Sequence, residues 1–152
     1  GSDSAPPNMI RAMDLAMGMT KTTTGNRASA QAADLFRSAT LDPAESLGRQ
    51  DLGRLAPGAQ ADYFVLDLTG QHIGPYGDPI RTMVLNSDGR DITRVVVAGR
   101  TIVDKGEILT VDTSDYRNRA QEFLGQYIAS LSVSDHARRS LEELLPPSFP
   151  LR

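Results

Sequence analysis

A glycine-rich turn and a short apolar strand follow one another in the segment Leu52-Gly53-Arg54-Leu55-Ala56-Pro57-Gly58-Ala59-Gln60-Ala61-Asp62-Tyr63-Phe64-Val65-Leu66-Asp67. Gly53 and Gly58 allow the tight turn before the strand, and the apolar run 63–66 is typical of a strand buried on both faces. Asp62 lies where the chain begins that strand, so its short side chain can bond nearby amides and fix the start of the strand. The segment therefore predicts structural roles for these residues, and none of them needs to contact a substrate.

Further strands are predicted on the C-terminal side of this segment. Residues 92–97 and 100–103 have the pattern of two strands joined at Ala98-Gly99, where the glycine permits the positive φ of a tight hairpin. A second turn at Lys105-Gly106 leads into Ile108-Leu109. Before the hairpin, Asp78-Pro79 predicts the start of a brief helix. The basic side chains of the hairpin are expected to form an exposed strand face; they are Arg94, Arg100 and Lys105.

Helices are predicted on the N-terminal side. Asn8 suits the N-cap of a helix whose apolar residues recur at spacings of three and four: Met9, Ile10, Met13, Ala16 and Met17. Gly18 and the polar run 20–26 are expected to end that helix. The methionines predict core packing rather than a soft ligand-binding face, because Met fills irregular gaps well.

Two shorter helices follow in the prediction. Ser29 is expected to begin the first, which carries the apolar residues Ala32, Leu35, Phe36 and Ala39. Asp42 and Pro43 suit the cap and first position of the second, and Glu45 can complete a capping box. Gly48, which can take a positive φ, then ends it.

The last element is an amphipathic helix. Its apolar stripe has helical spacing and consists of Tyr116, Ala120, Phe123, Leu124, Tyr127, Ile128 and Leu131. Ser114 or Thr113 is expected at its cap. Residues 135–145 predict a short solvated helix that includes His136, and the tail 148–152 is expected to be extended and to lie on a partner subunit.

Composition excludes several classes of protein. The chain has 152 residues, a net charge of −3 and 5% aromatic residues, which argues against a nucleic-acid partner. No apolar run approaches the roughly 20 residues that span a bilayer, so no membrane partner is expected. The absence of cysteine fits a cytoplasmic location. Gly1-Ser2 resembles the scar of a removed tag, but the motif described next favours native residues.

Four segments carry a family resemblance. They are Gly1-Ser2-Asp3-Ser4; residues 35–40 with Pro43-Ala44 and Leu47-Gly48; the pattern G-x-L-x-x-G-x-x-A-D within residues 53–62, followed by its apolar strand; and residues 78–106. Together they resemble the C-terminal region of the amidohydrolase superfamily, in the cytosine deaminase, guanine deaminase and triazine chlorohydrolase-like group. The resemblance covers residues 1–131, and its third and fourth segments are the most specific.

The resemblance implies an α+β fragment. Residues 1–50 would be the end of a (β/α)8 TIM barrel, with its last strand and helices. Residues 51–111 would be the C-terminal half of a small β-sandwich, and residues 112–152 a terminal amphipathic helix and tail. The partners implied are the remainder of the parent barrel and a small heterocyclic substrate, with a homo-oligomer also expected from the long helix and the tail.

The chemistry implied is metal-dependent hydrolysis. In such families a divalent metal, zinc or iron, is held by histidines on earlier strands and by an aspartate on the last strand, where Asp3 would lie. Asp3 is then the metal ligand and the catalytic proton acceptor from the water that the metal activates. The parent would hydrolyse C–N bonds by deamination, or C–Cl bonds, of a nitrogen heterocycle.

These residues alone do not supply a complete centre. A catalytic zinc takes three protein ligands, mostly histidine, and this chain has only His72 and His136, without a His-x-His pair. His72 is expected in a loop between strand and helix. The fragment alone is therefore expected to be metal-free and inactive. The alternative is a non-catalytic α+β assembly module, in which Asp3 would be an ordinary turn or cap residue.

Overall fold

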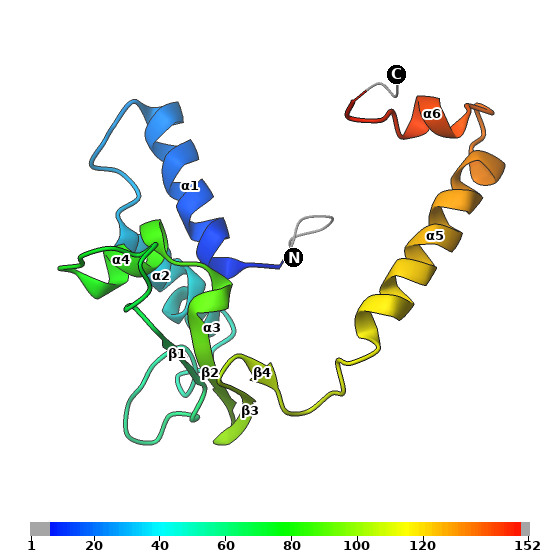
Figure 1. The fold of residues 1–152 in the computed structure, drawn as a ribbon. Coiled ribbons are helices and arrows are strands. Elements are labelled where there is room, and N and C mark those ends of the chain that lie inside the picture. Colours follow the sequence, from blue (N-terminus) through cyan, green and yellow to red (C-terminus); the bar gives the residue numbers. More distant parts are fainter. Residues whose placement is uncertain (1–6, 150–152) are drawn as a thin grey trace. The chain divides into compact units, whose positions relative to one another are not determined.

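The structure, a computed structural model, describes residues 7–149. These residues form two compact units that divide between Thr110 and Val111. The elements of the first unit, in chain order, are α1 (Met9–Thr24), α2 (Ala32–Ala39), α3 (Leu41–Ser46), β1 (Tyr63–Leu66), α4 (Pro79–Asn86), the 3₁₀ turn η1 (Gly89–Asp91), β2 (Ile92–Val97), β3 (Arg100–Asp104) and β4 (Glu107–Ile108). The second unit contains α5 (Tyr116–Ser134) and α6 (Leu141–Leu144) (Figure 1). The α+β composition is as predicted.

The strands form one antiparallel sheet in the order β1-β2-β3-β4. The β2–β3 hairpin turns at Ala98 and Gly99, whose φ angles are 50° and 75°. Two positive φ angles in a row give the right-handed twist that a two-residue hairpin needs, so this predicted turn is confirmed. The turn from β3 to β4 repeats the arrangement at Lys105 and Gly106, with φ angles of 51° and 80°.

Asp62 fixes the start of β1, as predicted, but its partner is distant in the sequence. Its Oδ1 accepts a hydrogen bond from the backbone amide of Ala98, 36 residues further on, at 2.6 Å. The amide of Gly99 donates to the carbonyl of Ala61 at 3.0 Å. One carboxylate therefore ties the tip of the β2–β3 hairpin to the beginning of the neighbouring strand.

Replacing Asp62 with alanine is expected to destabilise the first unit by about 1 kcal/mol, the net value of a typical hydrogen bond. Asp62→Asn retains an oxygen acceptor and should lose less stability than Asp62→Ala. Urea unfolding of the two variants beside the wild type measures the difference. An Asp62→Ala variant as stable as the wild type would show that the amide of Ala98 finds an equivalent partner in water.

The core of the first unit lies between helices and sheet. Its buried cluster consists of Ile10, Met13, Met17, Ala32, Met83 and Val84, with Leu66 and Ile92 of the sheet packed against it. The predicted methionine packing therefore holds for two residues of α1, whereas Met9 and Met19 are exposed. Because Ile10 belongs to this cluster, the N-terminal turn of α1 is held against the core.

The helix boundaries correct three predictions. The first helix does not end at Gly18 but continues to Thr24, and Gly25 caps it with a φ of 64°. In its last turns, three threonine hydroxyls donate hydrogen bonds to the backbone carbonyls four residues earlier; they belong to Thr22, Thr23 and Thr24. These side chains therefore satisfy their polar groups within the helix. The second helix begins at Ala32 rather than Ser29, and Gln31 is its N-cap.

The third helix also begins earlier than predicted. Thr40, not Asp42, is its N-cap, because α2 and α3 meet there at a sharp corner. The carboxylates of Asp42 and Glu45 instead pair with Arg37, at 2.7 and 3.1 Å. Gly48 takes the predicted positive φ, 67°, after the last turn.

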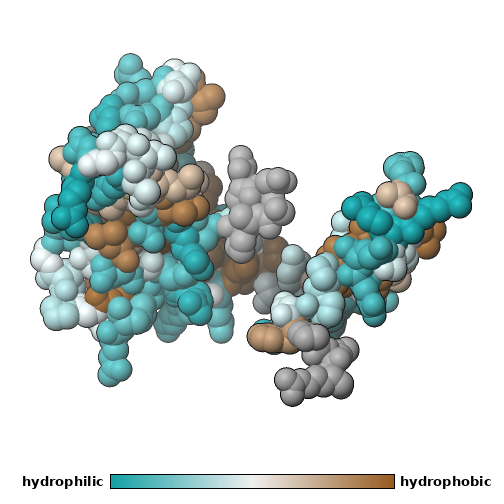
Figure 2. Space-filling model, turned by 90° about the horizontal axis from the view of Figure 1, so that it is seen from above, coloured by the Kyte–Doolittle hydropathy of each residue, from teal (hydrophilic) through white to brown (hydrophobic). Residues whose placement is uncertain are grey.

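Strand β1 was predicted to be buried on both faces, and this is wrong for the described residues. Tyr63, Phe64 and Val65 are each about two-fifths exposed, at 39%, 40% and 43%. Apolar patches reach the surface in the space-filling view (Figure 2). The strand lies at the edge of the sheet, so only β2 pairs with it among the described elements.

The second unit carries exposed apolar side chains. Every residue of α5 is at least partly exposed, including Tyr116, Phe123 and Tyr127 of the predicted stripe.

The N-cap of α5 is Asp115 rather than the predicted Ser114 or Thr113. His136 lies in the turn before α6, not on a helix. Neither α5 nor any other helix among residues 7–149 combines the length and the apolar character needed to cross a membrane.

Candidate functional site

The predicted catalytic and metal-binding residue, Asp3, lies outside the described residues. The first described residues after it along the chain are Pro7 and Asn8, which immediately precede α1. Asn8 is the N-cap, as predicted: its Oδ1 accepts from the amide of Arg11 at 3.3 Å. Its carbonyl oxygen accepts from the amide of Ala12 at 3.0 Å, the first backbone bond of the helix. The cap therefore fixes the chain five residues after Asp3.

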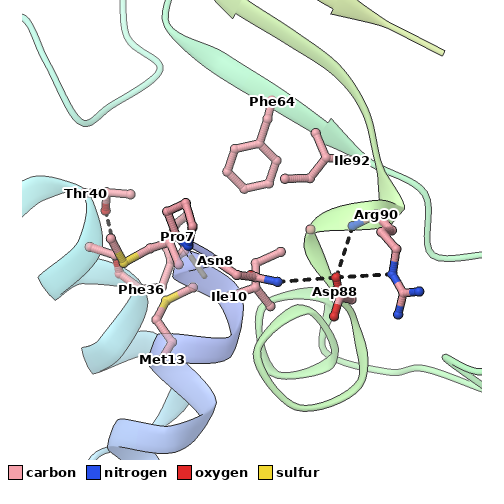
Figure 3. A pocket seen from close by; sticks show the side chains of 13 residues that line it. Pro7, Asn8, Ile10, Met13, Phe36, Thr40, Phe64, Asp88, Arg90 and Ile92 are labelled. Carbon is pink, nitrogen blue, oxygen red and sulfur yellow. Dashed lines mark hydrogen bonds and ion pairs between the residues drawn. The ribbon is translucent and has the colours of Figure 1, made fainter. Parts of the chain in front are cut away.

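Asn8 has a second partner that the sequence did not predict. Its Nδ2 donates to Oδ1 of Asp88, 80 residues away, at 3.3 Å (Figure 3). Asp88 lies between α4 and η1, on the approach to the sheet. No local pattern in the sequence points to this pair, because the two residues meet only when α1 packs beside η1.

Asp88 is an anion held by several donors. The amide of Arg90 donates to its Oδ1 at 3.2 Å, and the Arg90 guanidinium lies 3.6 Å from the same oxygen. That amide bond, followed by the charges of Arg90 and Arg11, lowers the pKa of Asp88 from its ordinary value. At neutral pH the acceptor of the Asn8 hydrogen bond is therefore a carboxylate.

Asp91 fixes the backbone around Asp88. Its Oδ2 accepts from the amide of Asp88 at 2.7 Å, and its Oδ1 lies 2.9 Å from Nε2 of His72. Its backbone oxygen accepts from the amide of Asp67 at 2.9 Å. His72 lies in the loop between β1 and α4, as predicted. The ring packs so closely on Gly70 that a Cβ there would lie 2.6 Å from a ring carbon.

A groove of about 530 Å³ opens beside Asn8. Its walls are mainly apolar, and its lining residues include Ile10, Met13, Phe36, Phe64 and Ile92, with Asn8, Asp88 and Arg90 as polar neighbours (Figure 3). The polar groups bond to one another, and the lining holds no pair of nucleophile and base. The groove can enclose apolar groups, but these residues alone do not perform a reaction.

The described residues do not fit a metal. Within residues 7–149, no group of three or more His, Cys, Asp or Glu side chains is close enough to hold an ion. Of the two histidines, His72 is engaged with Asp91, and His136 belongs to the second unit. A metal centre that used Asp3 would need its other ligands from beyond this part of the chain.

The chain resembles proteins of known function along most of its length. It is 34% identical over 116 residues to a 5-methylthioadenosine/S-adenosylhomocysteine deaminase of Pyrococcus horikoshii, covering 74% of this chain and 27% of the relative. It is 32% identical over 112 residues to a 5'-deoxyadenosine deaminase of Methanothermobacter thermautotrophicus, covering 71% and 26%. The chain thus spans little more than a quarter of the length of these relatives.

Solved structures of two hydrolytic enzymes are similar to this chain in fold. A zinc-bound adenosine deaminase of Xanthomonas campestris superposes with a TM-score of 0.73 at 24% identity, over 78% of this chain and 27% of that protein. A zinc complex of atrazine chlorohydrolase from Arthrobacter aurescens superposes with a TM-score of 0.68 at 26% identity, over 76% and 26%. The model of the Amidohydrolase family matches residues 1–102. The chain belongs to the amidohydrolase family.

Proposed function

We propose that this chain is the C-terminal part of a metal-dependent hydrolase that removes an amino group from a nitrogen heterocycle. The favoured substrates are adenosine derivatives altered at the 5' position. One observation carries the proposal: the 34% identity over 116 residues to a deaminase of 5-methylthioadenosine and S-adenosylhomocysteine. In this reaction water replaces the amine, so a C–N bond is broken, a carbonyl forms and ammonia leaves.

Asp3 is the proposed catalytic residue and metal ligand. A bound metal would lower the pKa of water to about 7 and so supply a nucleophile at neutral pH. Asp3 would hold that metal and accept the proton of the attacking water. Zinc is favoured over iron because two proteins of similar fold bind zinc. The remaining ligands and the base-binding pocket are proposed to come from segments outside this chain.

The proposed architecture is that of the C-terminal region of an amidohydrolase. Residues 1–50 would close a (β/α)8 barrel, residues 51–111 would form half of a β-sandwich, and residues 112–152 a terminal helix and tail. What supports the sandwich is the four-stranded sheet whose edge strand, β1, exposes apolar side chains. A change of compact unit after Thr110 supports the last boundary. A cytoplasmic location and a homo-oligomer remain part of the proposal.

A second candidate reaction is hydrolysis of a C–Cl bond in a triazine. The likeness to atrazine chlorohydrolase, at 26% identity and a TM-score of 0.68, favours it. Deamination is preferred because two relatives that are more than 30% identical to this chain are deaminases.

The test is an assay of the complete gene product with each class of substrate. We expect ammonia to be released from 5'-methylthioadenosine, S-adenosylhomocysteine or 5'-deoxyadenosine, and no chloride from atrazine. Chloride release without ammonia release would favour the second reaction. A complete gene product that turns over neither class, whether or not zinc is supplied, would favour the assembly module.

A further inference from the structure

We propose that helix α5 pairs with the α5 of a second copy of this chain, antiparallel and about a twofold axis between Phe123 and Leu124. The contact surface would be the apolar stripe of α5, whose members are Tyr116, Ala120, Phe123, Leu124, Tyr127, Ile128 and Leu131. This inference rests on the homo-oligomer of the proposed function and names its interface. It does not depend on which bond the enzyme hydrolyses.

The second unit does not bury this stripe by itself. None of the 19 residues of α5 is buried, and Tyr116, Phe123 and Tyr127 are 70%, 70% and 54% exposed. The short helix α6 packs on α5 but leaves these rings exposed. An isolated helix is marginally stable in water, and most helical stability in proteins comes from the packing of an apolar face. We therefore expect another surface to cover the stripe.

The order of side chains along the stripe is complementary to itself. About the proposed axis, three pairs of stripe residues face each other across the two copies: Phe123 with Leu124, Ala120 with Tyr127, and Tyr116 with Leu131. Each contact occurs twice, as twofold symmetry requires. The small side chain of Ala120 leaves room for the ring of Tyr127, and such alternation of small and large residues lets facing layers interdigitate.

The exposure of the stripe favours this register over a neighbouring one. In the proposed register the stripe residue without a stripe partner is Ile128, which is already partly buried. A shift by one helical turn would instead set Tyr116 against the charged Asp135, although the Tyr116 ring is the more exposed of the two stripe residues. The proposed register therefore covers more apolar surface.

The charged residues of α5 favour the antiparallel direction. They are Arg117, Arg119 and Glu122, all in the N-terminal half of the helix. A parallel pair would set the two copies of Arg119 side by side. In the antiparallel pair Arg119 lies at the level of Ile128, so the two copies of Arg119 are about 14 Å apart along the helices, beyond the Debye length of about 8 Å. Repulsion between them is then largely screened.

The surface is large enough for a specific pair. A covered aromatic side chain buries about 150–250 Å². With the exposed fractions given above, the rings of both copies and the adjoining Leu124 side chains would cover on the order of 1,000 Å², about the lower limit for a specific interface. The stripe also lies outside residues 1–102, which the family model matches. This favours a contact particular to this chain over one with the barrel that the family shares.

A single added cysteine tests the pairing on the complete gene product. This chain has no cysteine, so a cysteine on α5 reports one position, and the protein without it is the blank. Position 124 is beside the axis, so a short bismaleimide should convert most of the Leu124→Cys protein into covalent dimer on a denaturing gel. Tyr116→Cys should give no more dimer than the blank, because its two copies would be about 22 Å apart along the helices.

Leu124→Glu tests the pairing without a reagent. It places a carboxylate from each copy at the axis, where repulsion between like charges should raise the dissociation constant of the pair at least about tenfold in analytical ultracentrifugation. Val133→Glu is the matched control, because Val133 is 86% exposed and lies on the side of α5 away from the stripe. It should leave the dissociation constant within about twofold of the wild type.

The results that would overturn the pairing are equally specific. Leu124→Cys that yields no more dimer than the blank excludes it, and equal crosslinking at positions 116 and 124 indicates a parallel pair instead. Leu124→Glu with the assembled mass of the wild type would show that the stripe packs within its own chain.

Ammonia release tests the proposed function separately. An active enzyme whose Leu124→Cys variant does not crosslink would overturn the pairing and leave the proposed reaction intact. A crosslinked pair that hydrolyses no heterocycle would overturn the proposed reaction and leave the pairing intact.

Discussion

Replacing Asp3 with asparagine is expected to lower kcat/KM for the hydrolysed heterocycle by about 10³-fold, within the range found when a general base is removed. Asparagine has nearly the same shape as aspartate but no charge, so it binds a divalent cation weakly and cannot take a proton from water. The substrate pocket is unchanged, and KM should therefore move much less than kcat. Steady-state ammonia release by the complete gene product measures the effect.

A matched control is available in the first helix. Asp14 lies on the exposed side of α1, and Asp14→Asn removes the same charge by the same chemical change. Its activity is expected to stay within about twofold of the wild type, because an exposed surface charge contributes little and Asp14 has no role in the proposed chemistry. Metal content gives a second measurement: Asp3→Asn should hold less zinc per chain, and Asp14→Asn as much as the wild type. If Asp3→Asn hydrolyses substrate at the wild-type rate, Asp3 is not the proton acceptor.

Features fixed by a few neighbouring residues were predictable from the sequence. The hairpin at Ala98-Gly99 needs positive φ angles, and glycine is the residue that adopts them without strain. The cap at Asn8 and the start of α4 at Asp78-Pro79 follow from side-chain oxygens that reach amides three residues on. The order of helices and strands could therefore be predicted without tertiary contacts.

Features that depend on contacts between distant residues could not be predicted. The partner of Asp62 lies 36 residues away and that of Asn8 lies 80 residues away. Local spacing has no signal for such pairs, since they depend on how α1, η1 and the sheet pack. The prediction for β1 failed for a related reason: its apolar run indicates a strand that can be buried, but not what covers it.

The same limit applies to the candidate site. Asp3 was identified through a motif at the start of the chain and lies outside the residues that the structure describes. The structure adds that the start of α1 is anchored through hydrogen bonds that link Asn8, Asp88 and Asp91. The sequence suggested that Asn8 was a cap, and it is one. Its second hydrogen bond became visible only in three dimensions.

The largest loss of stability is expected from Gly53→Ala, in the glycine-containing segment that precedes β1. Gly53 has a φ of 70°, where an alanine costs about 1–2 kcal/mol. A Cβ at this position would also lie 2.8 Å from the carbonyl carbon of Thr40 and 3.2 Å from the amide of Leu41, and it would overlap the Thr40 oxygen. These are backbone atoms at the corner between α2 and α3, so they cannot move aside as a flexible side chain would. The expected total is about 3 kcal/mol or more, measured by urea unfolding.

Gly48→Ala separates the two causes of that loss. Gly48 has nearly the same φ, 67°, but no atom lies within 4 Å of the place where its Cβ would be. Gly48→Ala should therefore lower the free energy of unfolding by only about 1–2 kcal/mol, which is the cost of placing an alanine in the left-handed conformation. The difference between the two variants measures the close approach of Gly53 to Thr40, which holds the turn before β1 against the helical corner. Equal losses in the two variants would mean that the backbone at Thr40 yields, and that Gly53 is needed for its φ angle alone.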